Sequence, residues 1–262
     1  MQDILKVEKV TESIVRITMD DEKTGNSLSD QMINLLSSII KEVSVDKSIK
    51  VIVIAATGKI FCSGHNLKEI TAARENNDQG ESYFRDLFES CSTLMQSIVN
   101  CPKPVIAEID GIATAAGCQL VASCDLAVAS DSSSFATPGV NLGLFCSTPM
   151  VALSRNVKKK DAMKMLLTGD MIDSAEAKRI SLINDHVPSE NLSTEVMELA
   201  NKIASKSMQT VKIGKSAFYK QAELSLSEAY KYTSEIMAEN TMNKDAKEGI
   251  SSFLEKRKPN WE

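Results

Sequence analysis

The amino-acid sequence predicts an α/β protein with a parallel or mixed sheet, followed by a helical C-terminal region. The first half of the chain alternates apolar, strand-like runs with amphipathic, helix-like segments, an order that implies right-handed crossovers between strands. The last third carries almost only helical periodicity. No internal repeat or Pro-rich linker separates these parts. We therefore expect one core, residues 1–200, with a helical extension, residues 201–262.

Five short apolar runs predict the strands. Residues 4–10 and 13–19 alternate polar with β-branched side chains, which is typical of short strands. Residues 50–56 (KVIVIAA) form an unbroken apolar run, typical of a strand buried on both faces. The runs 105–109 and 126–130 have the same strand length.

End signals and helical periodicity predict the helices. Ser29 caps a helix that runs to about Val45, and a helix over 82–99 ends before Pro102 and Pro104. In the last third, the periodicity covers residues 161–168, 174–181, 191–206, 208–222, 225–241 and 244–256.

Composition excludes several classes of protein. The 262 residues include 43% hydrophobic and 25% charged side chains, enough for a substantial core. The net charge of −5 gives no basic field for nucleic acid or an anionic membrane, so neither is expected as a partner. The six cysteines show no CxxC spacing, which favours reduced thiols over a metal site or disulfides.

The N-terminal sequence bears on localisation. It has no charged leader followed by an apolar core, and no apolar run reaches the ~18 residues of a membrane span. We therefore expect a cytoplasmic protein, with the mature form of an imported protein as the alternative.

A run of small residues, GIATAAGCQL over 111–120, lies between a predicted buried strand and an apolar helix. Such a turn allows backbone N–H groups at a helix start to approach a ligand oxygen. Gln119, just inside that helix, carries an amide instead of an acid. An amide does not exchange a proton near neutral pH as a carboxyl group would, which limits the chemistry at this position.

Seven stretches in order resemble the crotonase superfamily, the enoyl-CoA hydratase/isomerase family, over essentially the whole chain. They are residues 26–29, 61–68, 111–125, 135–138, 167–170, 174–178 and 253–259. The run LFCSTP over 144–149 is similar to a divergent subgroup, the enoyl-CoA hydratase domain-containing proteins. The resemblance implies a ββα-spiral core, a C-terminal helical trimerisation region, and a homotrimer or a hexamer built as a dimer of trimers.

The resemblance also implies a substrate and a binding site. The family stabilises the enolate of an acyl-CoA thioester with two backbone N–H groups, which correspond here to those of His65 and Ala116. Coenzyme A, as part of the substrate, would contact backbone groups of Ser63, His65 and Leu67, with Lys68 near a phosphate. No metal and no permanently bound cofactor are implied.

The chain departs from the family at the two glutamates that activate water in hydratases. Their positions hold Gln119 and Gly139, neither of which exchanges a proton near neutral pH. Hydration is therefore expected to be slow or absent, although enoyl-CoA hydratase remains the nominal activity. Isomerisation, thioester hydrolysis or decarboxylation, and a catalytically silent acyl-CoA-binding protein, are the alternatives. If the oxyanion hole is intact, restoring both glutamates should raise hydratase activity.

Several side chains have two readings. The His65 imidazole either acts as an acid or base, or the residue lends only its N–H. Gln119 either holds a water or a substrate carbonyl, or is satisfied by its neighbours. His186 is expected to be structural. Cys118 and Cys146 are expected to pack inertly, although a nucleophilic thiol activated by His65 is the alternative.

The remaining candidates lie near the vacant second acid and at the C-terminus. Asn141, Ser147 and Thr148 either line an acyl pocket or belong to a helix start, which we favour. Asp125 is expected to be a turn or cap residue. The basic segment 256–262 either contacts CoA phosphates or complements a helix dipole.

Overall fold

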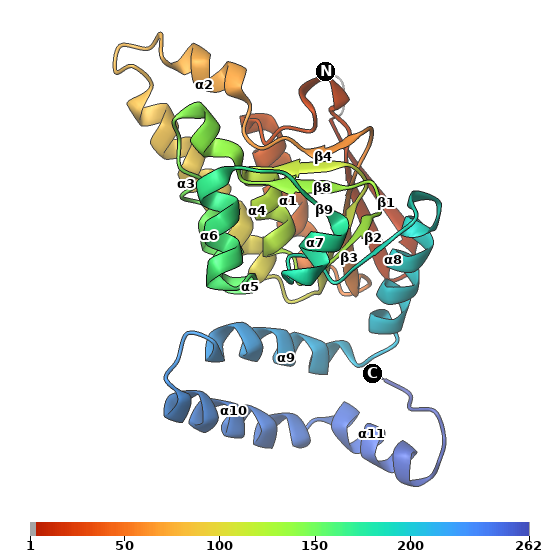
Figure 1. Cartoon of the computed structure of the whole chain (residues 1–262). Coiled ribbons are helices and arrows are strands. Elements are labelled where there is room, and N and C mark those ends of the chain that lie inside the picture. Colours follow the sequence, from red (N-terminus) through yellow and green to blue (C-terminus); the bar gives the residue numbers. More distant parts are fainter. Residues whose placement is uncertain (1–3, 262) are drawn as a thin grey trace.

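The computed structural model describes residues 4–261 and contains two sheets, helices packed against them, and a separate layer of three C-terminal helices (Figure 1). The larger sheet has the strand order β1 (Leu5–Thr11), β2 (Ile14–Met19), β3 (Val51–Ala56), β5 (Val105–Ile109), β7 (Leu126–Ser130), β10 (Asp185–Val187). The smaller sheet has the order β4 (Ile60–Cys62), β6 (Ile112–Thr114), β8 (Ser134–Ala136), β9 (Ile172–Asp173).

The larger sheet confirms the predicted mixed topology. β1 and β2 form an antiparallel hairpin, whereas β2, β3, β5, β7 and β10 run parallel. All of β5 and the first five residues of β3 are buried, as expected for strands covered on both faces. The α/β class and the inner strands are therefore confirmed.

Each inner strand is followed by a short strand of the second sheet: β3 by β4, β5 by β6, and β7 by β8. β4, β6 and β8 run parallel to one another, and β9 pairs antiparallel with β8. The sequence did not predict these strands, because two or three residues are too few to show a period. They place three successive loops side by side at the edge where the candidate site lies.

Apart from α2 and α5, for which the sequence predicted no range, the helices agree with the predicted ranges to within a few residues. They are α1 (Asp30–Val45), α2 (Leu67–Ala73), α3 (Glu81–Val99), α4 (Ala116–Ser123), α5 (Pro149–Asn156), α6 (Lys159–Thr168), α7 (Ser174–Arg179), α8 (Ser189–Ala204), α9 (Met208–Gln221), α10 (Leu226–Thr241) and α11 (Lys244–Leu254). Ser29 caps α1 as predicted, accepting a hydrogen bond from the N–H of Met32. Among the residues described, no helix is both long and apolar enough to span a bilayer.

Helix α8 belongs to the core. Its Leu192 and Val196 pack with Ile14, Val53 and Ile106 of the larger sheet. Since α8 continues to Ala204, the layer that packs apart from the sheets begins with α9, a few residues after the division we drew at 200.

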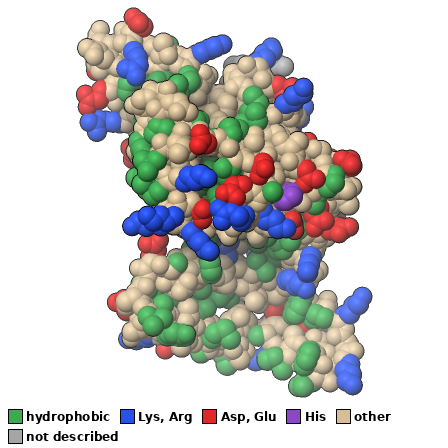
Figure 2. Space-filling model, viewed as in Figure 1, with side chains coloured by type: hydrophobic (Ala, Val, Ile, Leu, Met, Phe, Trp, Pro, Cys, Tyr) green, Lys and Arg blue, Asp and Glu red, His purple; other side chains and the backbone are tan. Residues whose placement is uncertain are grey.

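One buried ionic contact docks α9 on the core. Lys215 donates hydrogen bonds to the carbonyls of Ile98 and Lys103 and lies 2.6 Å from a carboxylate oxygen of Asp125. Tyr219 donates to the other oxygen of Asp125. Beyond this contact, the C-terminal layer exposes many apolar side chains (Figure 2), namely Phe218, Leu226, Tyr230, Met237, Met242, Ile250, Phe253 and Leu254.

Candidate functional site

Two loops meet where the neighbouring strands β4 and β6 end. Gly64 follows β4, and Ala115 follows β6. A Cβ atom on Gly64, which has φ +89°, would lie 3.0 Å from the Cβ of Ala115 and 3.3 Å from the backbone nitrogen of Ala116. This close approach places His65, the residue after Gly64, beside the start of α4.

The start of α4 has an unusual backbone. Ala115 has φ 51° and ψ −117°, a conformation that L-residues rarely adopt and that is common at functional sites. Its own N–H donates to the carbonyl of Ala136. Gly117 lets α4 press onto β4, because a Cβ there would lie 2.1 Å from the carbonyl oxygen of Cys62.

The predicted oxyanion donors are free in this geometry. Within residues 4–261, the N–H groups of His65 and Ala116 donate no hydrogen bond to another group of the chain. That of Ala116 also lies at the first residue of α4, where the helix dipole favours negative charge. Two neighbouring free N–H groups can stabilise an anionic oxygen.

Unpartnered polar atoms come from three segments next to these donors. Gln119 is 4% exposed and Thr137 is 1% exposed. In the described part of the chain, Gln119 Oε1, Thr137 Oγ1 and His65 Nε2 are buried without a hydrogen-bond partner. Buried polar atoms normally have partners, so this region is suited to a polar ligand. The Gln119 carbonyl is thus not satisfied by its neighbours.

The second acid position is crowded. Gly139 lies in a short 3-10 turn, Pro138–Leu142. A Cβ on Gly139 would lie 2.6 Å from the carbonyl oxygen of Leu144 and 2.8 Å from Cys146 Sγ. Residues 144–146 therefore fill the space in which a second glutamate would begin. This crowding argues against the expectation that two restored glutamates alone would raise hydratase activity.

Several backbone groups of the loop predicted to bind CoA, residues 63–68, already have hydrogen-bond partners within the chain. The Ser63 N–H donates to the carbonyl of Gly25, and the Ser63 carbonyl accepts a hydrogen bond from the Thr114 hydroxyl, so only the second lone pair of that carbonyl is left to contact a ligand. Leu67 and Lys68 begin α2, whose N-cap Asn66 accepts a hydrogen bond from the Lys68 N–H. Both side chains are exposed, and the Lys68 ammonium is thus available to an external anion.

The His65 ring is fixed by two contacts. Its Nδ1 lies 3.3 Å from the carbonyl oxygen of Leu28, and its ring meets Phe88 of α3 edge to face at 5.4 Å between centroids. Burial lowers the pKa of His65, and the Asp30 carboxylate opposes this effect. Burial also raises the pKa of Cys118 to about 12 and raises the pKa of Cys146, which favours inert packing of both thiols over a nucleophilic role.

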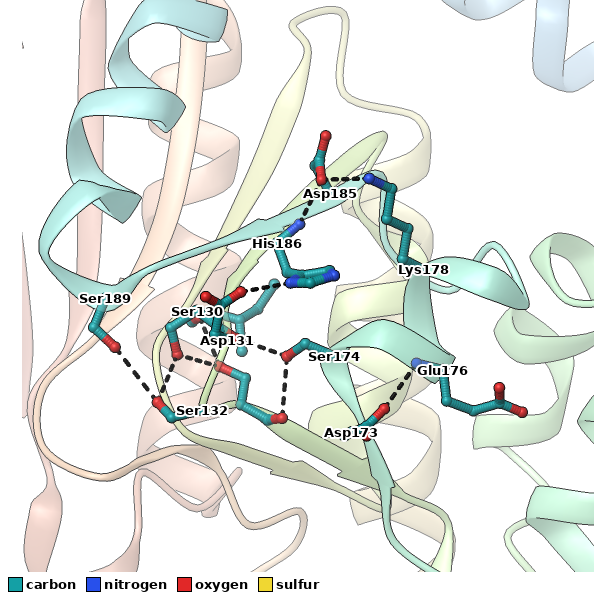
Figure 3. Close-up of polar contacts among 12 residues, drawn as sticks. Ser130, Asp131, Ser132, Asp173, Ser174, Glu176, Lys178, Asp185, His186 and Ser189 are labelled. Atoms are coloured by element: carbon teal, nitrogen blue, oxygen red, sulfur yellow. Dashed lines mark hydrogen bonds and ion pairs between the residues drawn. The ribbon is translucent and has the colours of Figure 1, made fainter.

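His186 lies in a structural network instead of beside a nucleophile. Figure 3 shows its Nδ1 facing Asp131, at 2.5 Å, where β10 adjoins the end of β7. Ser174 Oγ donates to the carbonyls of Ser130 and Ser133. In the range 4–261 no serine hydroxyl is hydrogen-bonded to His186. The network ties α7 and β10 to the turn after β7, as a structural role requires.

The other candidates have structural roles. α5 begins at Pro149, so Ser147 and Thr148 precede a helix as favoured. Asp125 accepts a hydrogen bond from the Val105 N–H, 20 residues away, and pairs with Lys215, so its contacts are long-range and are not those of the expected turn or cap residue. No short-range pattern reports that contact, because its partners are 90 residues apart.

The basic C-terminus pairs with the chain's own acids. Arg257 contacts Glu248 and Glu255, and Trp261 donates to the carbonyl of Ser205. Asn141 is exposed.

Two cavities lie away from the candidate site. One cavity of about 350 Å³ is lined by residues that include Asn156 and Asn184, and another of about 550 Å³ lies between α8 and α9. The residues described include no group of three His, Cys, Asp or Glu side chains that could hold a metal ion.

The fold and the loop geometry define a crotonase-type protein, and sequence similarity agrees. The chain belongs to the enoyl-CoA hydratase/isomerase family, because the family profile described as Enoyl-CoA hydratase/isomerase matches residues 9–262. It is 50% identical over 248 residues to "Enoyl-CoA hydratase domain-containing protein 3, mitochondrial" of Xenopus laevis, covering 95% of this chain and 83% of that protein. The Homo sapiens protein of that name is 49% identical over 250 residues, covering 95% of this chain and 81% of that protein.

Solved structures agree with both the family and the fold. The crystal structure of human enoyl Coenzyme A hydratase domain-containing protein 3 has a TM-score of 0.93 and 48% identity, covering 98% of this chain and 100% of that chain. An enoyl-CoA hydratase from Mycobacterium smegmatis has a TM-score of 0.94 and 42% identity, covering 99% of each chain. The family and subgroup resemblance is thereby confirmed.

The expected cytoplasmic localisation is wrong by this comparison. Five relatives at 44–50% identity are all named mitochondrial. The expectation depended on the missing pattern of a charged leader followed by an apolar core, and that pattern does not report import into mitochondria.

Proposed function

We propose that this protein is an acyl-CoA-processing enzyme that stabilises a thioester enolate with the backbone N–H groups of His65 and Ala116. The observation that carries the proposal is the close approach of Gly64 to the start of α4, beside which the N–H groups of His65 and Ala116 have no acceptor within residues 4–261. Removing one such donor costs roughly 10²–10³ in rate in enzymes that use them. Because the donors belong to the backbone, the pair tolerates side-chain substitution.

Coenzyme A would enter as part of the substrate, with no permanently bound cofactor. Support comes from the exposed start of α2, where Lys68 offers an ammonium group to a phosphate, and from the Ser63 carbonyl, which keeps a second lone pair beside its hydrogen bond from Thr114. His65 and Leu67 would contribute further backbone contacts.

Among the family reactions, those that need fewer acidic side chains are favoured over hydration. Gln119 replaces one family acid, and the space beside Gly139 is filled by Leu144 and Cys146. The same crowding favours a second candidate function, a catalytically silent acyl-CoA-binding protein.

Two further properties belong to this proposal. The apolar side chains exposed on α9, α10 and α11 support self-association as a homotrimer or a dimer of trimers. The mitochondrial names of the relatives at 44–50% identity support a mitochondrial location.

The test is a time course by NMR and mass spectrometry with crotonyl-CoA and a panel of short acyl-CoA thioesters, against a blank without protein. Conversion of any thioester at an enzymic rate supports the enzyme. Saturable binding with every thioester returned unchanged supports the silent protein, and no binding contradicts both.

A further inference from the structure

The orientation of the His65 imidazole defines which nitrogen carries the proton. Nδ1 lies 3.3 Å from the carbonyl oxygen of Leu28. Since a carbonyl only accepts, Nδ1 must donate, and the neutral ring then carries a lone pair on Nε2. Leu28 is itself fixed, because it is fully buried and its N–H donates to the carbonyl of Gly64.

Nε2 is a buried acceptor without a donor in residues 4–261. The ring packs edge to face against Phe88, which is 39% exposed. Nε2 can therefore accept a proton without losing a hydrogen bond within residues 4–261.

The charged groups that face His65 leave it neutral near pH 7. Asp30 of α1 favours its protonation, but burial outweighs that attraction and lowers the pKa of His65. Asp30 is shared, because Tyr83 of α3 donates to Asp30 and lies 3.5 Å from Glu69 of α2. The Asp30 N–H also donates to Glu69. A neutral imidazole with a free lone pair is a competent general base.

We propose that His65 Nε2 removes the α-proton of the bound acyl-CoA thioester, so that one residue supplies both an oxyanion donor and the base. This inference rests on the proposed function. The Cα–H bond breaks, its proton forms a bond to Nε2, and its electron pair forms a Cα=C bond while the carbonyl π pair moves to oxygen. The resulting enolate oxygen accepts hydrogen bonds from the N–H groups of His65 and Ala116. Return of the proton to Cα regenerates the thioester.

This step assigns a role that neither family acid position can fill here. Gln119 has an amide, and Gly139 has no side chain and no room for one. Proton exchange at Cα is therefore expected to depend on His65 alone, and no added oxidant or second substrate is needed.

The experiment measures deuterium incorporation at Cα of butyryl-CoA in D₂O, because this saturated thioester can neither be hydrated nor isomerised. His65→Gln keeps the backbone N–H and should lower the exchange rate by about 10²–10⁴, while butyryl-CoA still binds. His186→Gln, at the other histidine, is the matched control and should exchange at the wild-type rate. In His65→Ala, added free imidazole should restore part of the exchange.

The pH profile separates a chemical role from a structural one. The exchange rate of the wild type should rise with pH, reach half its maximum at a pH below the ordinary histidine pKa of about 6.5, and then stay level. The exchange rate of His65→Gln should not show this rise. Exchange in His65→Gln at the wild-type rate and pH midpoint would overturn the inference. Butyryl-CoA binding without exchange in the wild type would overturn it while leaving thioester binding intact, whereas no binding would contradict the proposed function itself.

Discussion

Reversal of the two acid positions is predicted to fail, and the structure gives the reason. A Cβ on Gly139 would lie 2.6 Å from the carbonyl oxygen of Leu144 and 2.8 Å from Cys146 Sγ. Ordinary contacts to carbon are near 3.5–4.0 Å, so residues 144–146 must move by roughly 1 Å before a glutamate fits. Overpacking of this kind typically costs about 1–3 kcal/mol of stability.

We therefore expect Gln119→Glu combined with Gly139→Glu to show no gain in crotonyl-CoA hydration and a lower free energy of unfolding. The paired acids would otherwise be worth about 10²–10⁴ each, although they act as a unit. The assay is formation of 3-hydroxybutyryl-CoA by NMR and mass spectrometry, with denaturant unfolding of the same samples. Gly139→Ala controls for crowding without charge.

One result would refute this reasoning. If the double variant hydrates crotonyl-CoA about 10²-fold faster than the wild type with unchanged unfolding free energy, residues 144–146 yield without cost and the contacts at Gly139 do not block the site.

Three further predictions concern stability and reactivity. Lys215→Met should lower the free energy of unfolding by about 3–5 kcal/mol, because it leaves the Asp125 carboxylate without its cation. Lys212→Met, at an exposed lysine of the same helix, should leave the free energy of unfolding nearly unchanged in a urea titration. Equal losses in both variants would argue against the buried ion pair. Because burial raises the pKa of Cys62 and Cys118 to about 12, both thiols should react with a disulfide reagent at pH 8 only after unfolding, and rapid reaction of the folded protein would contradict their burial. Burial lowers the pKa of His65, so the unfolded chain binds this proton at a higher pH than the folded chain does. The contribution of the neutral His65 ring to the free energy of unfolding is therefore full above about pH 6.5 and falls as the pH drops through the folded pKa. His65→Phe should reduce this pH dependence in urea titrations across pH 5–7.

The helices and inner strands could be predicted from sequence because each carries its own local signal. β3 shows an unbroken apolar run, and α1 has both its Ser29 cap and an amphipathic period. The strands of the smaller sheet are two or three residues long, and their pairing depends on neighbours far along the chain. α2, with seven residues, lies where the sequence predicted no helix.

The sequence predicted the features of the site that depend on local backbone conformation, but not those that depend on packing between distant segments. The small-residue turn pointed to the start of α4, and the structure places Gly64 against it. The strained Ala115 and the unpartnered Thr137 lie within the stretches that resemble the family, but nothing in their residue type marks them. The crowding at Gly139 depends on the path of residues 144–146, which no local pattern describes.

The central claim, a backbone oxyanion hole between Gly64 and the start of α4, is tested most directly by a pair of glycine substitutions. Gly64→Ala places a Cβ 3.3 Å from the Ala116 nitrogen, whereas Gly143→Ala imposes alanine at a similar positive φ but meets nothing within 4 Å. The measurement is the rate of α-proton exchange of butyryl-CoA in both variants and the wild type. We predict a loss of about 10²–10³ in Gly64→Ala and a rate near the wild type in Gly143→Ala; equal rates in all three proteins would contradict the claim.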